Sequence, residues 1–165
     1  MIAVGNESMV HWASQYYVTP SIVLKWVNYL QHLKETGTLP EPLWITSSDN
    51  FESWGGGNKS YHTPDLEKLI EAVDLISLHT YPFHDTHYNP NFWIIPRDGQ
   101  TLSPQEQIDA AMLNEKNYAQ TQYEQTCSYT ERLNPNKSIQ TGETGWATTA
   151  SVNYGSNGSK AADEY

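Results

Sequence analysis

Short apolar runs alternate along the chain with segments of helical periodicity. The apolar runs are Ile2–Val4, Leu43–Ser47, Leu75–His79 and Ser138–Thr141. Their length and continuity predict strands that are buried on both faces, as in a parallel sheet. Between them, apolar residues recur three and four positions apart, which predicts amphipathic helices. Four strands separated by three helices imply parallel strands joined by right-handed crossovers.

Each predicted helix begins with a hydroxyl residue followed by proline, at Thr19-Pro20, Thr63-Pro64 and Ser103-Pro104. The hydroxyl suits the cap and the proline suits the first helical position. In the third helix, Glu106 completes a capping box with Ser103. We expect the first helix to end near Gly37 and the third to end near Leu133. The apolar faces are predicted to carry Ile22, Trp26, Val27, Leu30 and Leu33 in the first helix, Leu66, Leu69, Ile70 and Val73 in the second, and Ile108, Ala111, Met112 and Leu133 in the third.

A doubly wound sheet and a TIM (β/α)8 barrel both fit this alternation. Candidate functional residues follow successive strands, which favours the barrel, because a barrel gathers such residues at the carboxyl ends of its strands. A complete barrel needs about 250 residues and eight strands. The chain has 165 residues and only four predicted strands. We therefore expect an α/β fold that is a partial TIM barrel.

Composition narrows the class of partner. Nine Lys and Arg residues stand against nineteen Asp and Glu residues, a net charge of -10, which argues against nucleic acid or an anionic membrane as a partner. No apolar run reaches the length of a membrane span. Six Trp and eleven Tyr residues suit a wet pocket that stacks sugar rings, although packing between sheet and helices would also use them. The compartment stays open among extracellular, periplasmic and cytoplasmic.

Two glutamates stand at the ends of predicted strands. Glu7 closes the first run after Gly5 and Asn6, and Glu143 closes the last. Two carboxylates that face each other across a pocket are what hydrolysis of a glycosidic bond requires. One would hold a proton through burial and a negative neighbour and act as a general acid. The other would be ionised and attack the anomeric carbon.

Three motifs at successive strand ends resemble a known family. Gly5-Asn6-Glu7 resembles the Asn-Glu signature after the fourth strand of clan A glycoside hydrolases, and Glu143-Thr144-Gly145-Trp146 resembles the nucleophile segment after their seventh strand. With Tyr81-Pro82-Phe83 between them, the set is most similar to glycoside hydrolase family 17, the β-1,3-glucanases and glucanosyltransferases, particularly the bacterial members. The resemblance implies that residues 1–165 are the central-to-late part of one catalytic domain, strands four to seven with their helices, truncated at both ends and inactive alone.

The resemblance also implies roles. Glu7 would be the acid/base and Glu143 the nucleophile of a retaining double displacement on a β-linked glucan, most of all a β-1,3-glucan, with no cofactor. Asn6 would bind a sugar hydroxyl, Tyr81 would hold Glu143, and Trp146 would form a wall of the subsite. Ordinary strand-end hydrogen bonding is the alternative for Asn6 and Tyr81. The same residues would serve a glucanosyltransferase, and a non-catalytic glycan-binding fragment is a further alternative; the oligomeric state stays open.

The polar segment Thr46–Trp54 is predicted to be a loop that contacts glycan. Asp49 and Trp54 are its candidate substrate contacts, although loop capping explains Asp49 equally well. Imidazoles and carboxylates suggest a metal site, but their spacing fits no metal motif, so we expect no metal and assign His79 to substrate binding. The residues considered for that metal site are His79, His84, Asp85 and His87.

Overall fold

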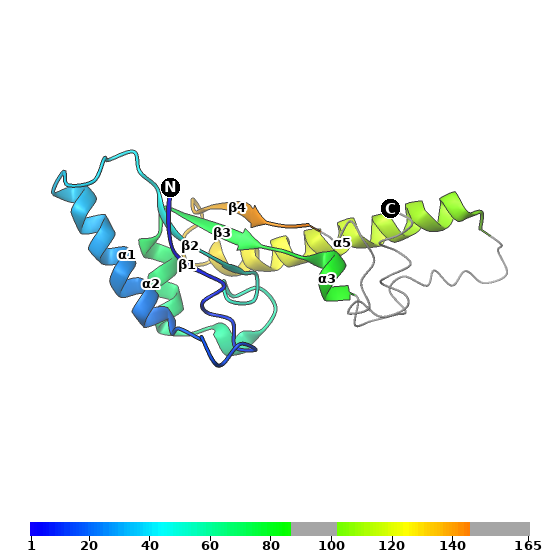
Figure 1. The fold of residues 1–165 in the computed structure, drawn as a ribbon, viewed down its shortest axis with the longest axis horizontal. Helices are drawn as coiled ribbons and strands as arrows, with labels where there is room; N and C mark the ends of the chain where they lie inside the picture. The colour runs from blue at the N-terminus through cyan, green and yellow to red at the C-terminus, as the bar shows by residue number, and fades with distance from the viewer. Residues whose placement is uncertain (87–101, 146–165) are drawn as a thin grey trace. The chain divides into compact units, whose positions relative to one another are not determined.

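The computed structural model describes residues 1–86 and 102–145. Its sheet has four strands in the order β1-β2-β3-β4, and every neighbouring pair is parallel. The α/β class and the alternation of parallel strands with helices are therefore confirmed (Figure 1). The elements are β1 (Ile2–Asn6), α1 (Pro20–Glu35), β2 (Ile45–Asn50), the 3₁₀ turn η1 (Lys59–Tyr61), α2 (Pro64–Ala72), β3 (Leu75–His79), α3 (Pro82–Thr86), α5 (Pro104–Thr130) and β4 (Ser138–Glu143).

The chain divides into two compact units. The first contains Met1–Thr80 and Gln122–Glu143 and so holds the whole sheet, while the second begins with Tyr81–Thr121 and continues from Thr144. Both glutamates identified from the sequence belong to the first unit. The two units are described separately below.

Strand β2 is the element that the sequence pattern placed least well. It runs from Ile45 to Asn50 rather than from Leu43 to Ser47. Its second half is polar but largely buried, since Asp49 is fully enclosed, and such residues read as a loop by hydropathy. The prediction of a glycan-contacting loop from Thr46 is therefore wrong over the five residues that belong to β2.

The two faces of the sheet differ in polarity, because side chains alternate along a strand. Ile45, Ile76 and Leu78 belong to the hydrophobic core. Ser77 and His79 alternate with Ile76 and Leu78 and so point to the opposite face, where they are also buried. Burial of both faces was predicted correctly for β2 and β3 but not for β1 and β4, which contain exposed residues. The second face is polar toward the carboxyl ends of the strands.

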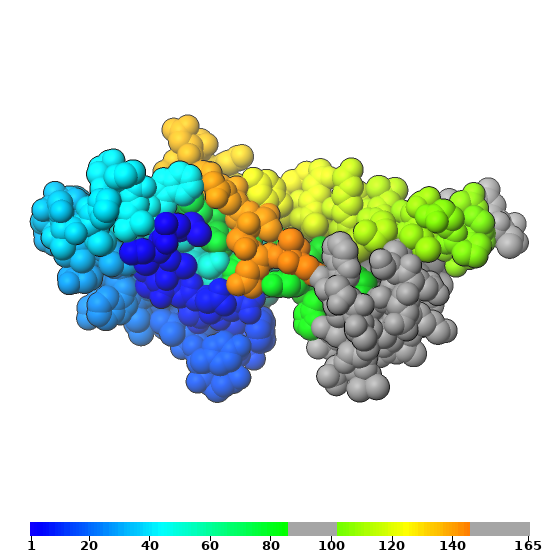
Figure 2. Space-filling view, turned by 45° about the horizontal axis from the view of Figure 1, so that its top comes forward, coloured from blue at the N-terminus to red at the C-terminus, as the bar shows by residue number. Residues whose placement is uncertain are grey.

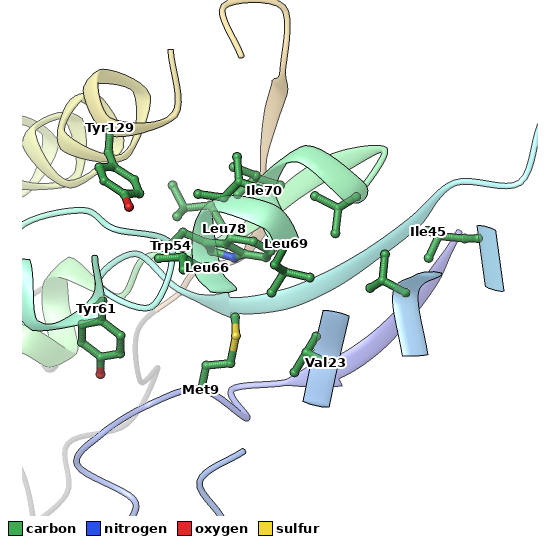
Figure 3. Packing of buried hydrophobic residues seen from close by; sticks show 13 residues of the cluster. Met9, Val23, Ile45, Trp54, Tyr61, Leu66, Leu69, Ile70, Leu78 and Tyr129 are labelled. Carbon is green, nitrogen blue, oxygen red and sulfur yellow. The ribbon is translucent and has the colours of Figure 1, made fainter. Parts of the chain in front are cut away.

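Helices α1 and α2 cover the apolar face of the sheet (Figure 1). Leu66, Leu69 and Ile70 of α2 are completely buried, as predicted, and Figure 3 shows them gathered with Trp54 and Leu78. Helix α1 buries Val23 and Val27. Its predicted face is wrong at two positions, as Ile22 and Trp26 are 50% and 51% exposed.

The predicted caps form at two of the three helices. Thr63 accepts a hydrogen bond from the Leu66 amide at 3.2 Å. In the capping box, the Ser103 amide donates to Glu106 at 2.8 Å and the Glu106 amide donates to the Ser103 hydroxyl at 3.3 Å. Thr19 makes no side-chain cap, since its hydroxyl pairs with that of Ser21 at 2.8 Å.

The last turns of α5 pack on the loop that follows β2. Tyr129 joins the core of the first unit, and a Cβ at Gly55 would overlap its ring. Gly55 also has φ of +88°, a conformation that side chains disfavour. Glycine therefore lets this loop approach the helix. Within residues 1–86 and 102–145, no helix is both long and apolar enough to cross a membrane.

Candidate active site

An irregularity in strand pairing precedes each of the two glutamates. In β1, Ala3 pairs with Thr46 but Asn6 pairs with Ser48, so β1 holds one more residue than β2 over that stretch. In β4, Thr141 pairs with Leu78 but Glu143 pairs with His79, which leaves Gly142 as the extra residue. A one-residue shift moves the following side chains to the other face. Through its bulge, β4 brings Glu143 level with His79.

Glu7 and Glu143 converge on the same imidazole nitrogen. Oε1 of Glu7 lies 3.3 Å from Nδ1 of His79, and Oε2 of Glu143 lies 3.5 Å from it. His79 is completely buried, whereas the two glutamate side chains are 29% and 40% exposed. A ligand can therefore reach both carboxylates but not the imidazole. Figure 2 shows that the regions of β1 (dark blue) and β4 (orange) both reach the surface on the face drawn.

The backbone at Glu7 has an unusual conformation. Its φ is +46°, in the left-handed region that non-glycine residues rarely adopt and that is often found at functional sites. The Glu7 amide donates to the Ser48 carbonyl at 2.9 Å, which ties this turn to β2. The next two amides, of Ser8 and Met9, donate to Oδ2 of Asp49 at 3.0 and 3.1 Å. The structure thus fixes Glu7 through its neighbours on both sides.

Asp49 supports the loop that follows β1. Burial raises the pKa of its carboxyl, and the hydrogen bonds from the Met9, Asn50 and Ser8 amides oppose that rise without cancelling it. Because Asp49 is 0% exposed, the predicted substrate contact is not supported. The loop-capping alternative describes its position.

Trp54 is likewise enclosed. Its side chain is completely buried, and its indole N–H donates to the Ser77 carbonyl at 3.1 Å. The predicted substrate contact by Trp54 is therefore wrong for this structure. Its ring fills the core of the first unit instead (Figure 3).

The second imidazole nitrogen of His79 faces two serine hydroxyls. Nε2 lies 2.5 Å from Oγ of Ser48, and Oγ of Ser48 lies 2.7 Å from Oγ of Ser77. Neither serine is predicted to be functional from the sequence. A serine in a strand gives no indication of function in the sequence alone. Only the strand register, which pairs Ser48 with Ser77 across β2 and β3, brings the two residues together.

The remaining predicted residues are placed as follows. Asn6 ends β1 and is exposed, so its amide is accessible to a ligand. Tyr81 is partly buried and belongs to the second unit. His79 lies against both glutamates and is completely buried, so a substrate cannot contact its ring in this structure. Trp146 lies outside the described residues, as does His87 of the metal hypothesis.

The second unit contains a separate pocket of about 210 Å³. Phe83 of α3 and Met112 and Ala119 of α5 give it an apolar lining, and Thr144 and Gly145 also border it. Over the described parts of the chain, no three His, Cys, Asp or Glu side chains are arranged to hold a metal ion.

The fold is similar to the crystal structure of an endo-laminarinase from Formosa Hel1_33_131. The two sequences are 56% identical over the match, and the TM-score is 0.88. The match covers 96% of this chain but 40% of the endo-laminarinase, so the chain spans about two fifths of that protein's length. A comparison with models of protein families and one with curated proteins each found no match.

Proposed function

We propose that the chain is part of the catalytic domain of a β-glucan hydrolase, with a β-1,3-glucan as its most suitable substrate. The observation that carries the proposal is the convergence of two partly exposed carboxylates, Glu7 and Glu143, on one buried imidazole. The substrate class is supported by the 56% identity to an endo-laminarinase, since laminarin is a β-1,3-glucan. An oligosaccharide or polysaccharide is therefore the proposed partner.

We also propose that the parallel sheet is the segment from strand four to strand seven of a (β/α)8 barrel of glycoside hydrolase family 17. The parallel order of the strands supports this arrangement, as do the positions of the glutamates at the carboxyl ends of the first and last strands. The endo-laminarinase is long enough to supply four further units, because this chain matches 40% of it.

The proposed chemistry is a retaining double displacement. Glu143 attacks the anomeric carbon while Glu7 gives its proton to the leaving oxygen; Glu7 then takes a proton from water, which releases the sugar from Glu143. The two glutamate oxygens cannot be farther apart than the sum of their distances to Nδ1 of His79, which are 3.3 and 3.5 Å. A separation of about 5–5.5 Å between the carboxyl groups, which retaining enzymes use, is compatible with that limit.

Three further residues have predicted roles in substrate binding or in support of the reacting groups. Asn6 is exposed beside Glu7 and would bind a sugar hydroxyl next to the reacting carbon. The roles that the resemblance implies for Tyr81 and Trp146 stay predictions, because Tyr81 belongs to the second unit and Trp146 lies outside the described residues. Asp49 and Trp54 are left out of this set because both are buried.

Substitution of the two glutamates in the complete protein tests the proposal. We expect Glu143→Gln to abolish hydrolysis of β-1,3-glucan while oligosaccharide binding persists, because the amide cannot attack carbon. Glu7→Gln should slow hydrolysis by about 10²–10⁴-fold, and less for a substrate whose leaving group needs no proton. Glu35→Gln, on the exposed end of α1, is the matched control. Normal turnover by Glu143→Gln would refute the assignment.

The products of the same assay distinguish two fates of the glycosyl-enzyme. Hydrolysis gives shorter oligosaccharides whose new reducing ends first appear as the β-anomer, since a retaining enzyme keeps the configuration. Products longer than the substrate would indicate transfer to a second sugar by the same residues. A first product of the α-anomer would contradict the double displacement.

A further inference from the structure

The surroundings of His79 determine where its ring proton must lie. An ionised carboxylate only accepts hydrogen bonds, and Nδ1 faces oxygens of both Glu7 and Glu143 at 3.3 and 3.5 Å. Nδ1 must therefore carry hydrogen to bind either anion. In the neutral imidazole, the other nitrogen is then a bare acceptor.

The two serines supply the donor that the bare nitrogen needs. Ser48 lies 2.5 Å from Nε2 and can donate its hydroxyl hydrogen to it. Its oxygen remains able to accept from Ser77, whose hydroxyl lies 2.7 Å away. The hydrogen bonds then all run in one direction, from Ser77 to Ser48 to Nε2 and from Nδ1 to Glu7, with Glu143 as a second anion 3.5 Å from Nδ1.

The backbone leaves room for this pair of hydroxyls. A Cβ at Gly142 would overlap Oγ of Ser77 and lie 3.0 Å from Oγ of Ser48. Gly142 is the extra residue in β4 that also aligns Glu143 with His79. One glycine thus serves both the position of the carboxylate and the position of the hydroxyls.

We propose that Ser77 and Ser48 form a hydroxyl relay that donates to Nε2 of His79 and so supports the tautomer with the ring proton on Nδ1, in which one N–H donor serves whichever of Glu7 and Glu143 is negatively charged. The inference rests on the proposed function for the roles of the glutamates. The direction of the relay rests on geometry alone. Ser48, Ser77 and His79 are positioning residues, because they act through the carboxylates.

The relay suits a reaction in which negative charge moves between two carboxylates. Before the first step, Glu143 is ionised and Glu7 holds the proton that goes to the leaving oxygen. After that step, Glu143 is bonded to the sugar and Glu7 is the anion, until water returns a proton to Glu7 and frees Glu143. Because Nδ1 lies at similar distances from both, its N–H can follow the charge without movement of the ring, and His79 gains or loses no proton.

NMR of the ring nitrogens of His79 in the complete protein tests the relay without reference to activity. At a pH where the imidazole is neutral, we expect Nδ1 to be protonated and Nε2 to be bare. Ser48→Ala should remove the hydrogen bond that Nε2 accepts and so move the Nε2 shift, and Ser77→Ala should move the Nε2 shift to a smaller extent. Ser47→Ala is the matched control, because Ser47 is a buried serine of the same strand whose hydroxyl instead contacts the Gly5 carbonyl.

Two results would overturn the relay. One is a wild-type imidazole with its proton on Nε2; the other is unchanged nitrogen shifts in Ser48→Ala. If Ser48→Ala does not fold, the comparison rests on Ser77→Ala, which leaves the hydroxyl that touches His79 in place. In that case, unchanged shifts in Ser77→Ala would count against the proposal.

Kinetics of the same variants separate the relay from a merely structural effect. We expect Ser48→Ala to lower kcat by about tenfold with KM little changed, a smaller loss than the 10²–10³-fold typical of removing a donor that binds reacting atoms directly. Ser48→Thr, which keeps a hydroxyl, should restore much of that loss. His79→Asn places an amide N–H near the position of Nδ1 and needs no relay. Its kcat should therefore be higher than that of His79→Leu.

A double variant gives the sharpest comparison. Adding Ser48→Ala to His79→Asn should cost nothing further, because the relay has no ring nitrogen left to act on. If Ser48→Ala lowers kcat by the same factor in the wild type and in His79→Asn, the result would contradict the proposal. If the NMR result is as expected but Glu143→Gln still hydrolyses β-1,3-glucan, the proposed function fails while the relay stands.

Discussion

Replacement of Asp49 measures how strongly the loop beside Glu7 is held. In Asp49→Ala, the amides of Ser8 and Met9 lose the acceptor that lies 3.0 and 3.1 Å from them. A buried donor without a partner costs about 1–3 kcal/mol, so two donors give a loss of about 2–6 kcal/mol in the free energy of unfolding. Asp49→Asn keeps one acceptor oxygen in place but removes its charge, and we expect a smaller loss of about 1–2 kcal/mol.

Urea denaturation of the complete protein, followed by circular dichroism, gives these free energies. Asp109→Asn is the matched control, since Asp109 is exposed on α5 and its replacement should change stability by no more than about 0.5 kcal/mol. Amide hydrogen exchange adds a local measurement, in which Ser8 and Met9 should exchange faster in Asp49→Ala than in Asp49→Asn. A loss below about 1 kcal/mol for Asp49→Ala, or equal losses for Ala and Asn, would refute the reasoning.

The pH dependence of stability provides a second test of the Asp49 site. Burial raises the pKa of Asp49 above the ordinary aspartate value of 3.8, so above that value the folded state retains a proton that the unfolded chain releases. The contribution to stability is therefore complete below pH 3.8 and is lost as the pH rises through the folded pKa. Asp49→Asn should lack this decline. A decline of equal size in both proteins would show that other groups cause it.

Two further predictions concern groups that join separate strands. Gly142→Ala should destabilise the complete protein by about 1–3 kcal/mol, because the new Cβ overlaps Ser77. In urea denaturation, the double variant with Ser77→Ala should recover most of that loss. If no stability is recovered, the overlap is not the cause. Asp74 accepts hydrogen bonds from the Lys34 ammonium at 2.9 Å and the Ile45 amide at 2.7 Å. Burial alone would raise the pKa of Asp74. The hydrogen bonds from Lys34, Ile45 and Gln31 outweigh burial and lower the pKa from 3.8. The stability that Asp74 contributes is thus present above pH 3.8 and lost as the pH falls through the folded pKa. On acidification, the free energy of unfolding of Asp74→Asn should therefore decline less steeply than that of the wild type. An equally steep decline in both proteins would contradict the argument.

The sequence predicted those elements whose positions are determined by residues within the element or next to it. Strand β3 was placed at its observed bounds of Leu75 and His79, because it is apolar and follows a helix whose start is signalled by Thr63-Pro64. The buried face of α2 was also predicted, since its apolar residues form one narrow stripe. Helix α1 was less well predicted, because its apolar residues extend around more than one face and periodicity alone could not tell Val23 from Ile22.

The short helix α3 and the far end of β2 were missed for a different reason. Residues Pro82–Thr86 form α3, but five residues are too few for a hydrophobic period to be visible. In β2, polar residues are buried because the neighbouring strand and the loop after β1 bind them, as Asp49 binds Ser8 and Met9. Such partners are distant in sequence, so hydropathy of the segment itself carries no sign of them.

The sequence pointed to the two glutamates and to His79 as site residues, but not to the way in which they meet. The positions of the glutamates at strand ends were visible, but the pairing that turns them toward His79 depends on an extra residue in β1 and another in β4. Gly5 and Gly142 were available signals, because an isolated glycine in a strand often marks a bulge. The convergence on one nitrogen needed the register of all four strands, which no single segment determines.

Several departures from the sequence pattern fall in one part of the first unit. The polar half of β2, the two bulges and the left-handed backbone of Glu7 all lie toward the carboxyl ends of the strands. Each is unfavourable for a sheet taken alone, since buried polar groups and strained dihedrals cost free energy that must be offset by specific partners. Their partners are one another: the Glu7 amide binds Ser48, and Ser48 binds His79, which contacts both carboxylates. Local rules for strands are set aside where they would leave the glutamates on different faces, which is the pattern expected of a sequence selected for a site as well as for a fold.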